Sequence, residues 1–577
     1  MTAVVPPRLG RFAPGLAALF AYDRRDLRPD VVAGLSVAAV ALPVGIAYAE
    51  IARVPAVVGI YSAVFPLFAY ALFGSSRQLM TGPDAATCLM AAAGIGTIAG
   101  NAPQQYMALM VALTLMTGLF YLVAGAARLG FIANFLSQPI LVGYLNGIAL
   151  IILIGQLPKL CGFAVKGDGF FPQVAEIVER LDATHPPTLI LGASLLVLLV
   201  ALQRLAPRLP GALIVAIVGI GVAITLGLAD RGVAVLGSVP AGFPALRLPS
   251  FDLAEFKDLV RDAAGIMLIS FTSGVLTAKS FAQRNRYDIN ANQELIAFGA
   301  CNLASGLAQG FPVTGADSRT AVNNATGGRT QLVGIIAGAA MLVFLSFLTA
   351  PLAHLPTTAL AAIIIVSAFG LFDFAALRNL WDASGRELAF SLATTAGVLL
   401  LGVLPGVLLA VVLSLLWLLS VGSRPHDAIL GRAPGVKGFH DINDYPEAAT
   451  IPGLLIYRFD AALVFFNCDH FRERVLRHIA QSATPVEWVL IDASPINVVD
   501  YTALQKLDEL RQELRARGIT LAYARVKQSL HRFFRPDWIT GRAEAEGRLI
   551  FPTEKSAIDA FECRTQQPNS AGEAETS

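Results

Sequence analysis

The chain has 577 residues, of which 55% are hydrophobic and only 15% are charged, and its mean hydropathy is +0.63. About a quarter of the residues of a soluble globular protein are charged, so the composition excludes that class. A formal net charge of +2 does not suggest a nucleic-acid partner. The five cysteines are scattered without paired or metal-ligand spacing, so we expect no disulfide framework and no metal site.

The chain begins with a basic segment, residues 1–30, that lacks the apolar region and cleavage site of a signal peptide, and we expect it to be cytoplasmic. Apolar runs of about 18–23 residues fill the following 31–422 and predict membrane helices. The stretch 169–182 is instead typical of an amphipathic helix at the membrane surface. We expect fourteen membrane segments, at 31–50, 55–74, 83–97, 105–126, 131–157, 187–206, 211–228, 260–281, 291–308, 315–326, 330–350, 356–371, 386–403 and 405–422.

Fourteen segments divide into two halves of seven, 31–228 and 260–422. A repeat with an odd number of spans inserts in the opposite orientation the second time, which is the plan of many secondary transporters. Arginines concentrate in the connections on the side of the N-terminus, although Arg53, Lys159 and Arg231 fall on the other side. The positive-inside rule therefore places both termini in the cytoplasm.

One polar phrase occurs in the third segment of each half, as TGPDAAT (81–87) and TGADSRT (314–320). Both segments are short, because about 15 residues cover about 22 Å of a hydrocarbon core that is about 30 Å thick. Short, interrupted segments at matching places point to a binding site near the membrane midplane. Each helix N-terminus offers free N–H groups and the positive end of a helix dipole, so two that meet predict an anion site.

The acidic residues of the two phrases allow two interpretations. Thr81 with Asp84, and Thr314 with Asp317, match the capping box, in which a hydroxyl and a carboxylate each bind a free N–H group at the start of a helix. The alternative is that one of the aspartates titrates or binds a coupling cation. The capping interpretation is the simpler one.

Arg319 has no counterpart in the first phrase, where Ala86 stands. A guanidinium within a membrane segment is costly and normally faces the protein interior or a cavity. Arg319 either forms a salt bridge with Asp317 or Asp84, or it supplies a fixed positive charge beside an anion. The planar fork of arginine suits anions with several oxygens, and the neighbouring Ser318 adds a hydroxyl donor.

The composition changes near Ser423, after which charged residues occur every few positions. We expect a linker at 423–448, a compact domain at 449–562 and a disordered polar tail at 563–577. The runs LLIYRF, VLID and ITLAYARV are typical of buried strands, and CDHFRERVLRHIAQ of a helix. The sequence therefore predicts a soluble α/β domain at the C-terminal end.

The stretches ALPVGIAYAEIARVPAVVGIYSAVFPLFAYALFGSSRQLMTGPDAAT, NQELIAFGACNLASGLAQGFPVTGADSRTAVN and GGRTQLVGI resemble the sulfate permease family, SulP, the bacterial relatives of the SLC26 anion transporters. The resemblance implies an α-helical polytopic membrane protein whose fourteen segments form two inverted repeats, divided into a core and a gate domain. It also implies a cytoplasmic C-terminal STAS domain and a homodimer. The anion would lie between the third and tenth segments.

The resemblance departs from the family pattern in the eighth segment. Many bacterial members carry a glutamate six residues before the lysine of a K-S-F-A stretch, and Ser273 stands there in this chain. The obvious proton-binding group is therefore missing, although Ser270 and Thr272 could still face the site. In soluble STAS regulators a hydroxyl shortly after the central Asp is phosphorylated. Thr502 is the nearest match, and it either is a regulatory site or only caps the helix at 503.

We therefore predict an anion transporter without catalytic residues, metal or cofactor, whose partners are a small inorganic anion such as sulfate, bicarbonate or chloride, the bilayer, a second copy and cytoplasmic STAS regulators. The coupling ion stays open between protons, Na⁺ and a counter-anion. Alternatives are a C4-dicarboxylate or nucleobase symporter, and a membrane-tethered STAS protein that senses anions. The candidate substrate-binding residues are Arg319, Ser318, Asp317, Ala316, Asp84, Ala85, Ala86, Thr87, Ser273 and Tyr48, and the coupling candidates are Asp84, Asp317, Ser273 and Thr272.

Overall fold

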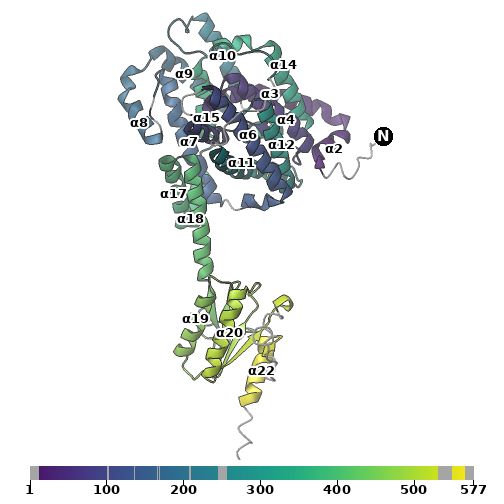
Figure 1. Cartoon of the computed structure of the whole chain (residues 1–577), viewed down its shortest axis with the longest axis vertical. Coiled ribbons are helices and arrows are strands. Elements are labelled where there is room, and N and C mark those ends of the chain that lie inside the picture. The colour runs from purple at the N-terminus through teal and green to yellow at the C-terminus, as the bar shows by residue number, and fades with distance from the viewer. Residues whose placement is uncertain are drawn as a thin grey trace, which may run out of the picture. The chain divides into compact units, whose positions relative to one another are not determined.

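The computed structural model describes residues 12–99, 103–134, 137–165, 167, 169–206, 209–244, 256–530 and 549–565. Packing divides the chain into two units, Met1–Leu413 and Ser414–Ser577, each described here by itself (Figure 1). The first unit is helical and the second is an α/β domain joined to the end of a long helix.

Each of the fourteen expected membrane segments corresponds to a helix. The first half contains α3 (Leu27–Ile51), α4 (Ala56–Phe73), α5 (Ala85–Ala99), α6 (Pro103–Ala126), α7 (Gln138–Cys161), α9 (Pro186–Leu205) and α10 (Gly211–Thr225). The second half contains α11 (Phe256–Arg284), α12 (Ala291–Leu307), α13 (Asp317–Ala325), α14 (Leu332–Phe347), α15 (Thr357–Phe369), α17 (Gly385–Leu401) and α18 (Val403–Ser423). In each half the third helix is preceded by a two-residue strand, β1 (Thr81–Gly82) or β2 (Thr314–Gly315).

Seven stretches of the described chain are long and apolar enough to cross a membrane, judged by length and composition. The third helix of each half is among the shorter ones, as the sequence predicted. These stretches are Arg24–Ile51, Ala56–Phe73, Gln105–Ala126, Gln138–Cys161, Pro186–Leu205, Phe256–Arg284 and Thr357–Ala383.

A short amphipathic helix of ten residues follows the fifth membrane helix of each half. The first is α8 (Phe170–Glu179), where the sequence predicted a surface helix, and the second is α16 (Phe374–Ala383), which the sequence analysis missed. The side chain of Asp373 caps α16 by accepting a hydrogen bond from the N–H of Ala376 at 2.8 Å. The matching positions of the two helices support the division of the chain into two repeats.

The membrane helices form two groups that pack mainly among themselves. We call α3, α4, α5, α6, α11, α12, α13 and α14 the core helices, and α7, α9, α10, α15, α17 and α18 the gate helices. Close approach within the core depends on small residues, because a Cβ added to Gly59 of α4 would lie 2.1 Å from the carbonyl oxygen of Gly45 on α3. The site described below lies among the core helices.

The N-terminal residues that precede α3 also contain structure. Helix α2 spans Pro14–Phe20, and the short η1 spans Arg24–Asp26. The phenol of Tyr22, between them, donates a hydrogen bond to the buried carboxylate of Asp30 at 3.3 Å. Burial and the neighbouring Asp30 raise the pKa of Tyr22 to about 12, so the phenol keeps its proton at neutral pH.

The C-terminal unit contains a six-stranded sheet with the order β4-β3-β5-β6-β7-β8. Strands β5 to β8 are parallel, and β3 is antiparallel to both of its neighbours. Alternate residues of β5 face opposite sides, so Leu455 and Tyr457 pack under α19 and α20, whereas Leu454 and Ile456 pack under α22. The elements are β3 (Asp427–Gly431), β4 (His440–Asp441), β5 (Leu454–Phe459), α19 (Cys468–Gln481), β6 (Trp488–Asp492), α20 (Tyr501–Ala516), β7 (Thr520–Ala524), β8 (Ile550–Phe551) and α22 (Glu554–Thr565).

Two of the expected domain boundaries differ from the structure. The stretch 423–448, expected as a linker, contains β3 and β4, which belong to the sheet. The tail expected from residue 563 begins while α22 is still helical, and 566–577 lie outside the described residues. Both differences have the same cause, because short polar elements gain their stability from partners elsewhere in the chain.

Asp427 of β3 is the centre of a polar cluster beneath α19. Its Oδ2 accepts hydrogen bonds from the Tyr457 hydroxyl at 2.9 Å and from Nε of Arg474 at 2.7 Å, and lies 3.4 Å from Nε2 of His478. Burial raises the pKa of Asp427, but the hydrogen bonds from Arg474 and Tyr457 outweigh burial, so the pKa lies below its usual value. The carboxylate is therefore ionised at neutral pH and stabilises the folded domain.

The substitution Asp427→Ala is expected to lower the free energy of unfolding of the C-terminal unit by about 1–3 kcal/mol, because it leaves two donors without their acceptor. A depressed pKa also means that the stabilisation is present above the unfolded-state pKa and is lost as the pH falls through the folded-state pKa. Thermal unfolding of the full chain at neutral and acid pH measures both effects. Asp469→Ala is the control, since that side chain is 78% exposed, and an equal loss in both variants would contradict the assignment.

Candidate functional site

The two polar phrases meet in a short antiparallel bridge. Thr81 pairs with Gly315 and Gly82 with Thr314, and the N–H of Ala316 donates to the Met80 carbonyl at 2.8 Å. Helices α5 and α13 begin directly after the paired residues. Because the strands run in opposite directions, the two helices leave the bridge in opposite directions with their N-termini facing each other. The structure thus brings together the two positive helix ends.

The capping arrangement differs from the predicted capping box. Asp84 itself caps α5: its Oδ2 accepts from the N–H of Thr87 at 3.3 Å, and its carbonyl accepts from the N–H of Cys88 at 2.9 Å. Thr81 and Thr314 lie in the strands, one turn too early to cap, and the Thr314 hydroxyl donates to the Ser270 carbonyl at 2.7 Å. The capping-box prediction was therefore wrong in its details, because the bridge extends through both threonines.

Asp317 is also not a cap. Ala316 occupies the cap position of α13 and provides no side-chain hydrogen bond. The carboxylate of Asp317 accepts a short hydrogen bond from the Thr277 hydroxyl of α11. Asp317 therefore connects the second half-helix to α11, which leaves the first N–H groups of α13 without a side-chain partner from this position.

Arg319 lies beside the bridge, with its guanidinium next to Gly82 and Pro83, and is 1% exposed. Its Nη2 donates a short hydrogen bond to the carbonyl of Pro83, whereas Nε and Nη1 are buried without a hydrogen-bond partner in the described part of the chain. Within the described residues the guanidinium forms no salt bridge with Asp317 or Asp84, so that expected alternative is not observed. Arg319 therefore keeps buried donors available for a ligand.

Gly82 makes room for this arginine. A Cβ at Gly82 would lie 2.7 Å from Nη1 of Arg319, and the residue has a φ of 149° that side chains rarely adopt. The backbone of the first phrase therefore approaches the guanidinium of the second phrase more closely than any other residue type would allow.

Helix α11 supplies a third wall of the site. The hydroxyls of Thr87 and Ser270 lie 2.9 Å apart in a buried hydrogen bond. Ser273 is partly exposed, and its carbonyl accepts from the Thr277 hydroxyl at 3.0 Å. Thr272 instead donates to Leu268 of its own helix at 2.9 Å, so nothing in the structure directs its hydroxyl toward the bridge.

The other candidates also gather around the bridge. Ala85, Ala86 and Ala316 are buried at the starts of the two helices. Tyr48 of α3 is buried close enough to Asp84 and Arg319 to interact electrostatically with both. Ser318 is exposed in the first turn of α13. The predicted residues thus form one constellation, with Thr272 as the exception.

Sequence reasoning missed the roles of Thr277 and of the Pro83 carbonyl. Thr277 follows Ser270 by seven residues and Ser273 by four, spacings that share one face of a helix, so the spacing was a usable signal. The Pro83 carbonyl carried no signal, because any backbone group is an acceptor and only the fold selects this one.

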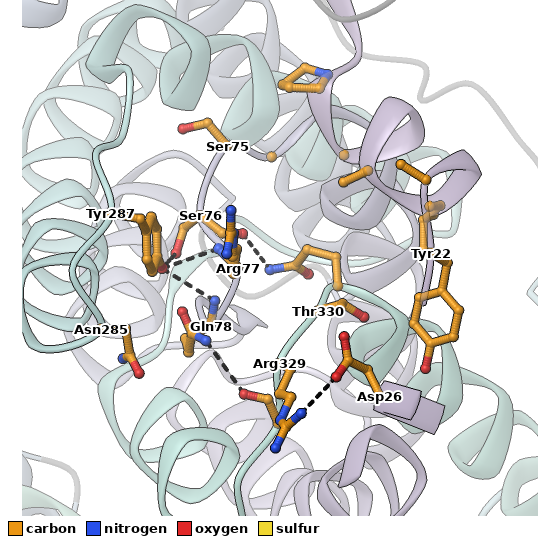
Figure 2. Close-up of a pocket in the computed structure, with 18 of the residues that line it drawn as sticks. Tyr22, Asp26, Ser75, Ser76, Arg77, Gln78, Asn285, Tyr287, Arg329 and Thr330 are labelled. Atoms are coloured by element: carbon orange, nitrogen blue, oxygen red, sulfur yellow. Dashed lines mark hydrogen bonds and ion pairs between the residues drawn. The ribbon is translucent and has the colours of Figure 1, made fainter. Parts of the chain in front are cut away.

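A separate cavity of about 930 Å³ opens where residues 74–78 and 327–331 meet, at the C-terminal end of α13 (Figure 2). Its lining includes charged and hydrogen-bonding groups: Nη1 of Arg329 pairs with Asp26 at 2.8 Å, and the Tyr287 hydroxyl accepts from the N–H of Arg77 at 3.1 Å. The cavity is lined by Asn324 near the end of α13 and not by Arg319, which lies in the first turn of that helix beside the bridge. The cavity and the bridge are therefore different features.

Thr502 is exposed in the first turn of α20. The cap of this helix is Asp500, whose Oδ1 accepts from the N–H of Ala503 at 2.8 Å. The interpretation of Thr502 as the cap was wrong, and its regulatory role stays a prediction. Across the residues that the structure describes, no group of three or more His, Cys, Asp or Glu side chains could hold a metal ion.

The fold, with its two opposed half-helices, is that of a helical membrane transporter built from two inverted repeats. Comparison with known proteins identifies the family. The sulfate permease family model matches residues 27–394 and the STAS domain model matches residues 445–556. The chain belongs to the sulfate permease family and is an anion transporter of the membrane with a C-terminal STAS domain.

Three relatives illustrate the similarity. A probable sulfate transporter of Mycobacterium tuberculosis is 44% identical over 553 residues, which cover 96% of this chain and 98% of the relative. The structure of the murine Solute Carrier 26 family member A9 anion transporter in the inward-facing state matches with a TM-score of 0.89 at 21% identity, over 98% of this chain and 96% of that one. The transmembrane domain of the cyanobacterial bicarbonate transporter BicA matches with a TM-score of 0.60 at 25% identity, over 68% of this chain and 98% of that one.

Proposed function

We propose that the protein moves sulfate or a similar small inorganic anion, such as bicarbonate or chloride, by alternating access. The anion would bind between Ala85–Thr87 of α5 and Ala316–Arg319 of α13. The observation that carries the proposal is Arg319, a buried guanidinium with two unpartnered nitrogens beside two helix N-termini. A buried positive charge of this kind favours an anion strongly, because little water screens it.

Sulfate is the first choice among the anions because its several oxygens match the planar fork of arginine, and because the relative with 44% identity is named a probable sulfate transporter. A C4-dicarboxylate has similar terminal oxygens and stays the nearest alternative. A nucleobase is less suited, because the helix face at Ser273 offers no carboxylate to bind its N–H groups. Asp84, Asp317 and Ser273 are the coupling candidates that lie at the bridge.

Three features of assembly belong to the same proposal. Both termini would be cytoplasmic, the transporter would be a homodimer, and the STAS domain would contact cytoplasmic regulators through a surface that includes Thr502. The arginine-rich connections support the orientation.

Uptake of labelled anions into proteoliposomes tests the function. A panel of sulfate, bicarbonate, chloride and a C4-dicarboxylate, with pH and Na⁺ gradients varied separately, is expected to show saturable sulfate uptake. Binding without uptake of any anion would instead support a membrane-tethered sensor. Faster uptake of the dicarboxylate than of sulfate would reverse the order of the two substrates.

The substitution Gly82→Ala is expected to weaken anion binding about tenfold, because the added Cβ displaces the Arg319 guanidinium and strains the backbone. Gly155→Ala is the matched control, since a Cβ there meets nothing within 4 Å. Equilibrium binding of labelled sulfate to both purified variants measures the effect. Equal affinities for the two variants would show that the position of the guanidinium does not matter.

A further inference from the structure

Among the buried acids of the core helices that lie outside the site, Asp262 differs from Asp30 and Glu294 in having an oxygen without a hydrogen-bond partner in the described part of the chain. Asp262 of α11 is 2% exposed. Its Oδ1 accepts a hydrogen bond from Nε of Arg261 at 3.1 Å, but that arginine is 60% exposed. Its Oδ2 is buried without a hydrogen-bond partner among the described residues. The ion pair therefore satisfies one side of the carboxyl group and leaves the other facing the protein.

The unpartnered oxygen faces the backbone of α5. A Cβ added to Gly94 would lie 2.5 Å from Oδ2 of Asp262, so only glycine leaves space for the carboxyl group. The two helices also meet at Thr87 of α5, seven residues before Gly94. Its hydroxyl is hydrogen-bonded to that of Ser270 on α11, eight residues after Asp262. The two helices therefore run antiparallel along their length, and Asp262 packs against the same helix whose start forms the proposed anion site.

Asp262 also shares a helix face with Ser273, the position where the family glutamate is missing. Eleven residues at about 100° each amount to three turns and about 20°, a separation of about 16 Å along the axis. The face of α11 that lacks an acid beside the bridge thus carries one nearer its start.

The surroundings of Oδ2 contain few charges. Arg261 and Asp258 are the charged neighbours on α11, and both are more than half exposed. Of the other elements that pack on α11, α5 and α6 contain no Asp, Glu, Lys or Arg. Helices α12 and α13 contain Glu294, Asp317 and Arg319, which bond to Ser75, Thr277 and Pro83 and not to Asp262. Arg53 lies 4.0 Å from the Cβ position of Gly96, which is two residues from Gly94 and on the opposite side of α5.

The surroundings of Oδ2 indicate which ligand Asp262 could bind. An ionised carboxylate oxygen without a partner is costly in an apolar interior, and a proton removes that cost. Ca²⁺ or Na⁺ would need several further oxygen ligands around Oδ2, which the helix packing does not supply. The titratable phenol of α6 nearest this end, Tyr106, already donates to the Ala52 carbonyl at 2.8 Å. A proton is the ligand that fits.

We propose that Asp262 is the proton-binding residue that couples anion transport to a proton gradient. The carboxylate takes a proton from a hydronium ion and leaves water, and the neutral acid returns the proton to water after the core helices have moved. The proton lowers the cost of carrying an acid through the membrane interior and offsets part of the charge of the anion. The inference rests on the proposed anion transport.

The full-length protein in proteoliposomes tests this with labelled sulfate and an imposed pH gradient. For one proton per sulfate, a gradient of two pH units, acid outside, can raise accumulation up to about 100-fold over no gradient. We expect gradient-driven accumulation in the wild type and its loss in Asp262→Asn, which keeps sulfate binding and sulfate–sulfate exchange. Asp258→Asn, one turn earlier and 54% exposed, is the control and is expected to accumulate like the wild type.

The outcomes separate the two proposals. Wild-type accumulation in Asp262→Asn, or sulfate uptake by the wild type that the pH gradient does not change, would overturn the role of Asp262 and leave the proposed function intact. No uptake of any anion would refute the proposed function itself. If Asp262→Asn does not fold, Asp262→Glu and a pH indicator decide: sulfate binding by the wild type and by Asp262→Glu is expected to take up protons, and no proton uptake would overturn the inference.

Discussion

Replacing Arg319 by alanine is expected to weaken anion binding about 100-fold while the protein stays folded. Truncating one partner of a buried, hydrogen-bonded charge pair typically costs 2–5 kcal/mol, and the lower part of that range gives this factor. The guanidinium is buried, and within the described residues Nη2 alone has a partner, the Pro83 carbonyl. A bound anion would therefore be the main partner of the charge.

The same variant is expected to melt at an unchanged or higher temperature. Among the described residues Arg319 makes no salt bridge, although Asp84 lies near enough to act on it electrostatically, so removal of the buried charge relieves more desolvation cost than it loses in pairing. Binding and stability would then change in opposite directions, as expected for a residue kept for function. A variant that binds less only because it is unfolded would show the reverse.

Equilibrium binding of labelled sulfate and thermal unfolding of the purified protein measure the two effects. Arg329→Ala is the matched control, because Arg329 is also an arginine of the second half but is 61% exposed and paired with Asp26. Its affinity should stay within about twofold of the wild type. Arg319→Lys should fall between, because an ammonium group does not reproduce the planar fork. An unchanged affinity in Arg319→Ala would remove the proposed site.

The sequence predicted the membrane fold well because its signal is local. An apolar run of sufficient length predicts a helix wherever it lies, so all fourteen segments were found. The repeated phrase marked the half-helices because polar residues within such runs are rare. Helix α16 was missed because its ten residues form a short run interrupted by Arg378, Asn379 and Asp382 and lie between two stronger signals.

Features that depend on contacts between distant residues could not be predicted. Strand β3 forms because β5, more than twenty residues away, pairs with it, so its five residues looked like a linker. From the sequence, Thr81 and Thr314 resembled helix caps. In the structure both threonines lie in the bridge that pairs the two halves. The sequence analysis assigned no role to Asp262, and only the structure shows that it is buried and packed against Gly94. The sequence alone does not show which residues become neighbours in the folded protein.

Reversing the charge of Lys159 or of Glu50 is expected to shift the transporter toward the state that is open at that end. Nζ of Lys159 on α7 lies 2.7 Å from Oε1 of Glu50 on α3, and the two side chains are 32% and 24% exposed. The pair joins a gate helix to a core helix, so the proposed alternating access requires that it break in each cycle. Like charges at this spacing cost about 1–2 kcal/mol instead of stabilising contact, which shifts the two populations about tenfold.

A cysteine introduced at Val54 reports the opening. Val54 is buried and, with Glu50 and Val57, lines a cavity of about 250 Å³ at this end of the helices. Labelling of Val54→Cys by a membrane-impermeant maleimide should rise about tenfold in Glu50→Lys and in Lys159→Glu. The double reversal, Glu50→Lys with Lys159→Glu, restores attraction and should restore slow labelling. If the double reversal is labelled as fast as the single ones, the charges do not act on each other, and closure at this end depends on apolar packing alone.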